Sequence, residues 1–165
     1  MTEKMRRHFL KAKDAEALLD MASEKLKIGL KELFKTRANV EVVQTEFAEI
    51  YLINNKPVLA KVGEKVFPTL IFDEFLASAP RVRVDMGAIP HVCNGANVMA
   101  PGIRRFEGDF REGDFVLIVD DRHGKSLALG EAVYDADKAK KTTHGVVVEN
   151  VHYVGDKVWN FLKKV

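Results

Sequence analysis

The sequence predicts an α+β protein, in which helices and a small antiparallel sheet are followed by a compact β-barrel. Two observations support this prediction. The longest helical spacing of apolar residues lies within about the first 35 positions, whereas short β-rich runs separated by turn residues predominate from residue 40 onward. In addition, residues 84–103 hold three glycines and two prolines among apolar residues, a pattern of tight, well-packed turns.

An amphipathic helix is predicted over residues 14–28. Leu18, Leu19, Ala22 and Leu26 share one face of it. Acidic residues lie in its first turn and basic residues in its last, as the helix dipole favours, and Gly29 is a suitable terminator. A second short helix is expected over residues 30–35.

Strands are predicted over residues 40–44, 47–53, 57–62 and 66–67. The Asn-Asn-Lys turn at residues 54–56 joins the second and third as a hairpin. Thr69 is the expected N-cap of a short apolar helix reaching residue 76. Small residues ending in Pro80 then mark a boundary, which divides the chain into domains 1–78 and 79–165.

The second half is predicted to begin with a strand at residues 81–85, a helical turn from Ala88 closed by Gly95, and a short strand before Pro101. Residues 104–109 read as an irregular loop. Strands at 115–119, 126–133 and 146–153, a polar turn at 120–125 and a short helix at 135–143 follow. Five or so strands with two short helices are typical of a small barrel.

Two motifs in this half carry a resemblance to a known family. They are Val84-Asp85-x-Gly87-Ala88 followed by Gly95-Ala96-Asn97-Val98-Met99-x-Pro101-Gly102-Ile103, and a closing run from Gly145 to Trp159. Residues 79–165 resemble a PUA domain, an RNA-binding module that folds as a β pseudobarrel. With Phe67-Pro68-Thr69-Leu70, most of the chain resembles the malignant T-cell-amplified sequence family and the corresponding part of ligatin.

The resemblance implies a non-enzymatic protein that binds RNA, either rRNA of the small ribosomal subunit or tRNA. Eukaryotic members of the family act in translation reinitiation and recycling with a density-regulated partner, so a translation-factor partner is implied as well. The alternative is a PUA accessory subunit for tRNA or rRNA modification. Residues 104–114 carry more charge than the family's corresponding loop.

The resemblance also implies an RNA surface, to which the flanking arginines are added on grounds of charge. Glycine lets a phosphate or sugar approach backbone N–H groups, and arginine neutralises phosphate. The competing interpretation is that the glycines only permit tight turns. The expected RNA-binding residues are Arg81, Arg83, Gly87, Ala88, Ile89, Gly95, Ala96, Asn97, Arg104, Arg105, Asn150, His152 and Tyr153.

Composition sets the remaining expectations. A net charge of +2 does not argue for nucleic acid, although basic residues gather at 1–13 (Lys4, Arg6, Arg7, Lys11, Lys13) and at 79–105. One cysteine and scattered histidines do not make a zinc site, and no cofactor or catalytic motif is present. No apolar run suits a membrane span, so we expect a cytoplasmic protein.

Overall fold

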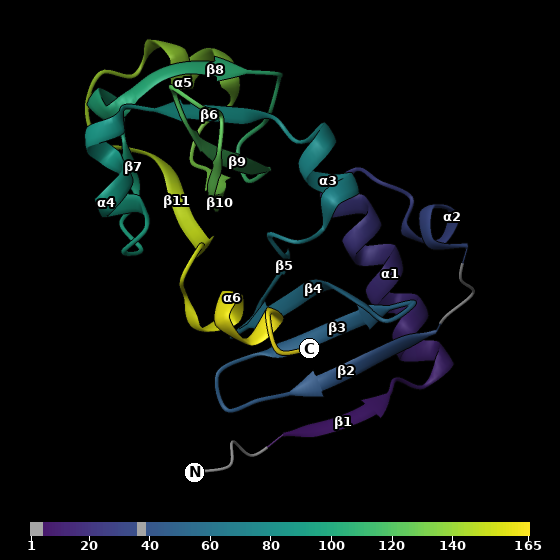
Figure 1. Cartoon of the computed structure of the whole chain (residues 1–165). Helices are drawn as coiled ribbons and strands as arrows, with labels where there is room; N and C mark the ends of the chain where they lie inside the picture. Colours follow the sequence, from purple (N-terminus) through teal and green to yellow (C-terminus); the bar gives the residue numbers. More distant parts are fainter. Residues whose placement is uncertain (1–4, 36–38) are drawn as a thin grey trace.

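The computed structural model describes residues 5–35 and 39–165, and shows two sheets with helices packed around the first (Figure 1). Lys4, part of the predicted N-terminal basic patch, lies outside the described residues. The first sheet is antiparallel throughout, in the order β1-β2-β3-β4-β5. Its strands are β1 (Arg6–Phe9), β2 (Val40–Gln44), β3 (Glu49–Ile53), β4 (Lys56–Val62) and β5 (Lys65–Pro68).

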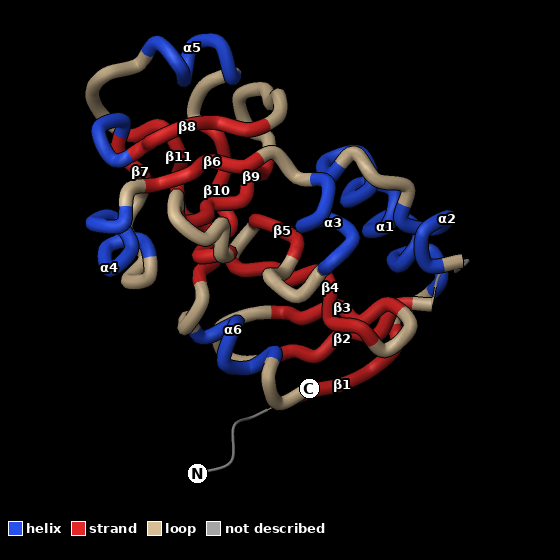
Figure 2. The backbone as a smooth tube through the Cα atoms, turned by 45° about the horizontal axis from the view of Figure 1, so that its top comes forward, coloured by secondary structure: helices blue, strands red, loops and turns tan. Residues whose placement is uncertain are grey.

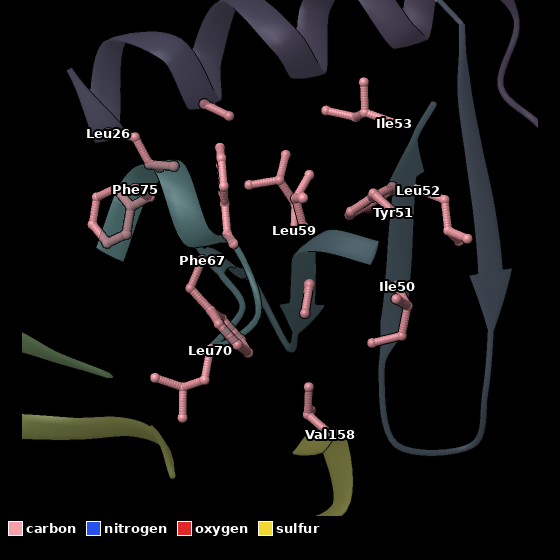
Figure 3. Packing of buried hydrophobic residues seen from close by; sticks show 14 of the residues in the cluster. Leu26, Ile50, Tyr51, Leu52, Ile53, Leu59, Phe67, Leu70, Phe75 and Val158 are labelled. Atoms are coloured by element: carbon pink, nitrogen blue, oxygen red, sulfur yellow. The ribbon is translucent and has the colours of Figure 1, made fainter. Parts of the chain in front are cut away.

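Three helices accompany this sheet, namely α1 (Ala12–Leu26), α2 (Leu30–Phe34) and α3 (Asp73–Ser78). The α1 face predicted from the sequence is the one that packs inward: Leu19, Ala22 and Leu26 are buried in the cluster that Figure 3 shows around Leu59 and Phe67. Burial of each leucine side chain contributes about 1.5–3 kcal/mol.

The second sheet has six strands in the order β7-β11-β10-β9-β6-β8, with β6 and β9 parallel. The strands are β6 (Arg81–Val84), β7 (Val98–Met99), β8 (Ile103–Glu107), β9 (Phe115–Asp120), β10 (Ser126–Ala132) and β11 (Val146–Tyr153). Its short helices are η1 (Met86–Ala88), α4 (Ile89–Val92), η2 (Ala100–Gly102) and α5 (Ala136–Lys141). The sheet curls around its own core of Val82, Val116, Ile118 and Val148. The α+β class with a PUA-type pseudobarrel is confirmed.

The last helix, α6 (Lys157–Leu162), returns to the first sheet (Figures 1 and 2). Its Val158, Phe161 and Leu162 join the same buried cluster as α1. Leu117 and Leu129 from the second sheet belong to that cluster too. One apolar core therefore runs from the helices of the first half into the barrel.

Two local predictions were wrong, and one strand was missed. Thr69 caps no helix, because its hydroxyl is buried and donates to the Pro57 carbonyl at 2.8 Å, and α3 begins only at Asp73. Residues 104–109 are not an irregular loop, since most of them form β8 beside β6. Strand β1 was missed because all four of its residues are exposed and three are cationic or imidazole side chains, which hides any apolar alternation.

Candidate nucleic-acid interface

The predicted glycine-rich stretch forms a compact projection that we call the platform, residues 86–97. It consists of η1, α4 and the turn after α4. The amide of Ala88 donates to the Asp85 carbonyl at 2.9 Å, and Cys93 donates to Ile89 at the same distance, so the helical turns run on continuously. Beneath the platform, the Asp85 amide donates to the Gly102 carbonyl at 2.8 Å, which ties it to η2.

The fold requires glycine at one of the two platform positions, Gly95, but not at the other, Gly87. Gly95 has a φ of +92°, which disfavours other residues, and a methyl group added there would lie 3.1 Å from Cε1 of Tyr153. Gly87 is exposed, has no positive φ, and would place a methyl group no closer than 3.6 Å to Asp85. The turn interpretation therefore accounts for Gly95, whereas Gly87 leaves open backbone that the fold itself does not require.

Strand β11 holds the platform in place through Asn150. The Asn150 side-chain amide donates to the carbonyls of Val92 and Ala96, both at 3.0 Å, and its backbone amide donates to Asn97 Oδ1 at 2.9 Å. The structure thus brings Gly95, Ala96, Asn97, Asn150 and Tyr153 together, as the sequence predicted. Because these hydrogen bonds occupy the Asn150 amide group, Asn150 orients the platform.

His152 does not belong to this surface, and its inclusion in the predicted site is corrected. Its side chain is fully buried, with Nε2 accepting from the Leu70 amide at 3.2 Å and Nδ1 lying 2.8 Å from Asp156 Oδ2. Because Nε2 accepts, Nδ1 carries the proton and donates to Asp156. His152 therefore joins β11 to the segment after β5.

A bulge explains this arrangement. The pairing of β11 with β10 shifts register between Leu129 and Gly130, so that Val151 is an extra residue on β11. Strict alternation would place Asn150 and His152 on one face, whereas the bulge turns them to opposite faces. Gly130 opposite the bulge has no room for a side chain, since an added methyl group would lie 2.2 Å from Val148 Cγ1.

The four predicted arginines fall into two groups. Arg83 is largely enclosed, pairs through Nε with Glu107, and donates to the Asp121 carbonyl at 3.2 Å. The Arg83 hydrogen bond lowers the pKa of Glu107. Arg81 donates to the Leu76 carbonyl at 3.1 Å. We therefore correct the expectation that Arg83 is a free phosphate ligand, because its guanidinium holds β6, β8 and the β9–β10 hairpin together.

Arg104 and Arg105 are the exposed pair, with 60% and 61% of their side chains accessible. Arg104 occupies a bulge in β8 where its pairing with β6 shifts register. Its Nη2 lies 3.5 Å from Asp85, while Arg105 Nε lies 3.7 Å from Asp121. Exposed pairs of this kind contribute about 0–1 kcal/mol, so both guanidinium groups can exchange their partners for a phosphate at little cost.

The β9–β10 hairpin was predicted from the sequence as two strands joined by a polar turn, but its cations were not included in the predicted site. The Asp120 carboxylate is buried and accepts from the amides of His123 at 2.5 Å and Lys125 at 2.8 Å, which lowers its pKa. This bonding fixes a turn that exposes Arg122, His123 and Lys125. Burial raises the pKa of Cys93 in the platform. Helix α4 of the platform contacts strand β10, which Lys125 immediately precedes. The sequence signal that could have revealed this ordered turn is Asp120 followed by Gly124, because an aspartate at the start of a turn accepts hydrogen bonds from the backbone amides after it.

The described residues contain no group of three or more His, Cys, Asp or Glu side chains able to hold a metal ion. Within the same residues, no helix has the length and apolar character needed to cross a bilayer.

Comparison with known proteins places this geometry in a family. The model of the PUA domain matches residues 80–154, and that of a domain of unknown function, DUF1947, matches residues 6–72. Malignant T-cell-amplified sequence 1 of Danio rerio is 31% identical over 137 residues, covering 79% of this chain and 76% of the relative. The chain belongs to the malignant T-cell-amplified sequence 1 family.

Other relatives extend the range of the family. MJ1432 of Methanocaldococcus jannaschii is 37% identical over 160 residues, which cover 94% of this chain and 96% of that protein. Translation machinery-associated protein 20 of Saccharomyces cerevisiae is 28% identical over 145 residues, covering 83% and 80%. Among solved structures, a PUA-domain protein of Aeropyrum pernix superposes with a TM-score of 0.81 at 25% identity, over 98% of this chain and 92% of that one.

Proposed function

We propose that this family member is a non-enzymatic RNA-binding protein that docks on the small ribosomal subunit and acts in translation initiation, reinitiation or recycling. One observation carries the proposal. Exposed, sterically open backbone at Gly87 lies on a fixed platform beside Arg104, which contacts Asp85, while the exposed Arg105 and Lys125 lie on strand β8 and the β9–β10 hairpin.

The chemistry of the platform suits RNA better than a small substrate. RNA bases and sugars bind to open backbone and flat surfaces, while neighbouring cations neutralise phosphates. The cations here come from strand β8 and the β9–β10 hairpin, so they can contact several successive phosphates rather than converge on one group. Such an interface gains most of its affinity from electrostatics and weakens steeply with added salt.

The assignment to translation is supported by relatives. The Saccharomyces cerevisiae relative is called a translation machinery-associated protein, and it aligns over both halves of this chain. Because the similarity extends over both halves, it supports a role in translation for the whole of this chain and not for one half alone. The protein partner implied by the family resemblance belongs to the same proposal.

The test combines cosedimentation with matched charge variants. The wild-type protein is expected to cosediment with purified small ribosomal subunits at low salt and to dissociate as salt rises. The double variant Arg104→Glu/Arg105→Glu should lose about tenfold or more in affinity and reduce the salt slope by about two. Lys140→Glu/Lys141→Glu, on exposed α5, is the matched control with the same change of charge.

An equal loss in both double variants would show that net charge, and not the platform, governs binding. If the protein fails to associate with small subunits but copurifies in stoichiometric amounts with an RNA-modifying enzyme, the accessory-subunit interpretation replaces this one. Retention of full affinity by Arg104→Glu/Arg105→Glu would move the site elsewhere.

A further inference from the structure

Strand β1 is an open edge of the first sheet, remote from the platform (Figure 1). It forms one end of the first sheet, and no strand of residues 5–35 and 39–165 pairs with its outer side (Figures 1 and 2). All four of its residues are exposed. Open edges of this kind accept additional strands, and proteins normally protect them.

The register of β1 shows which backbone groups are available. The Leu10 amide donates to the Val40 carbonyl at 2.9 Å, in continuation of the antiparallel pairing of β1 with β2. Hydrogen-bonded residues alternate along an antiparallel strand, so His8 and Arg6 also bond toward β2. The N–H and C=O groups of Arg7 and Phe9 consequently point outward.

The side chains around this edge combine positive charge with apolar surface. Residues 5–13 contain four cations (Arg6, Arg7, Lys11 and Lys13) and no acidic residue, and of these Arg7 is half exposed and pairs with Glu41 of β2 at 2.9 Å. Among them, Phe9 is 61% exposed and Met5 is 53% exposed. Cations alone would simply protect the edge from aggregation, but a large aromatic residue exposed beside open backbone adds apolar surface that protection does not require.

We propose that β1 docks an acidic, extended segment of a protein partner, which adds to the first sheet as an antiparallel strand. Glutamate or aspartate side chains of the partner lie opposite Arg6 and Arg7, and an apolar side chain covers Phe9. Strand addition of this kind takes its affinity from main-chain hydrogen bonds and its specificity from alternate side chains.

Two other occupants fit less well. A second copy of this chain would place the cations of one β1 opposite those of the other, and like charges directly across a strand pair are destabilising. RNA can bind the arginines and the outward N–H groups. Its phosphate groups, however, have no donors, so the outward C=O groups of Arg7 and Phe9 would depend on 2′-hydroxyl and base donors, whereas a peptide strand offers both a donor and an acceptor at each hydrogen-bonded residue pair.

The experiment uses the full-length protein and a capped peptide, Glu-Val-Thr-Glu-Glu-Val. In antiparallel register its central four residues place valine opposite Phe9 and glutamates opposite Arg7 and Arg6. Amide hydrogen exchange by NMR is the readout. Adding the peptide should slow exchange of the Arg7 and Phe9 amides at least roughly tenfold, while the amides of His8 and Leu10, already bonded to β2, change less.

Three comparisons complete the test. A peptide N-methylated on the backbone groups that face β1 keeps its charge but should bind at least about tenfold more weakly. Arg6→Gln/Lys11→Gln should lower peptide affinity roughly three- to tenfold, and Phe9→Ser about tenfold. The control variant Lys140→Gln/Lys141→Gln, on distant α5, should bind the peptide with unchanged affinity.

The proposal is overturned if the peptide protects no outward amide, or if the N-methylated peptide binds equally well. It is overturned in favour of RNA if a single-stranded oligonucleotide, and not the peptide, perturbs residues 5–13. Concentration-dependent protection of the same amides without peptide would instead identify a second copy of the chain as the occupant. None of these outcomes depends on whether the platform binds RNA.

Discussion

The pair formed by the buried His152 and the partly buried Asp156 should stabilise the fold well beyond an ordinary helix cap. Asp156 caps α6 by accepting from the Trp159 amide at 2.7 Å, and it accepts from the Tyr153 amide at 2.9 Å. The same carboxylate accepts from Nδ1 of His152, whose Nε2 is bonded to Leu70. Replacing Asp156 by alanine removes the three hydrogen bonds that its carboxylate accepts from His152, Tyr153 and Trp159.

The expected cost follows from adding two effects. Loss of an N-cap costs about 1 kcal/mol, and a buried N–H left without an acceptor at His152 costs about 1–3 kcal/mol. Asp156→Ala should therefore lower the free energy of unfolding by about 2–4 kcal/mol. For a domain of this size, each kcal/mol corresponds to roughly 2–4 °C in Tm.

Asp135→Ala provides the matched control. Asp135 caps α5 by accepting from the Lys138 amide at 2.9 Å and is exposed, so its loss should cost about 1 kcal/mol. Urea unfolding followed by circular dichroism measures both variants. If the two costs agree within about 0.5 kcal/mol, the His152 contact contributes nothing and the reasoning is refuted.

Three further predictions concern stability and the glycines. Gly130→Ala should destabilise the fold by about 1–3 kcal/mol in urea unfolding, because its methyl group overlaps Val148; a neutral result would show that the bulge can adjust. Gly87→Ala should leave stability unchanged or raised by about 0.4–1 kcal/mol, yet weaken RNA binding in a filter assay, and undiminished binding would show that the open backbone is not used. Burial raises the pKa of Asp156, but hydrogen bonds from His152 and the backbone lower it overall, so its contribution is present at neutral pH and lost as pH falls below about 4. The stability difference between wild type and Asp156→Asn should accordingly narrow between pH 7 and pH 3, and a constant difference would contradict this.

Sequence patterns predicted most elements because the spacing of apolar residues and the turn residues at the ends of each segment indicated the same structure. The helical face of Leu19 and Leu26, the hairpin at residues 54–56 and the strand at 146–153 all lie where expected. Each is a segment whose local preference matches its burial in the fold. Failures occurred where exposed charge concealed a strand, as in β1 and β8. Edge strands are defined by their pairing with neighbours, and that pairing leaves little trace in apolar periodicity.

The candidate site was predicted less completely, because contacts far apart in sequence decide which side chains are free. Arg83 and Arg105 are partners across β6 and β8, yet Arg83 is bound to Glu107 while Arg105 is exposed. Their residue type alone gives no sign of this difference. Lys125 became a candidate only because the fold packs α4 of the platform against β10, the strand that follows Lys125.

Strand β11 connects the platform to the segment that follows the first sheet. Through Asn150 it fixes the platform, and two residues later, through His152, it reaches the segment that follows the first sheet. The bulge at Val151 makes this possible, because it turns the two side chains to opposite faces of one strand. Gly130 lies opposite the bulge, where a larger residue would overlap Val148. A change at Gly130 should therefore disturb both the orientation of the platform and the bond from His152 to the segment after β5, even though Gly130 is buried and lies on neither proposed binding surface.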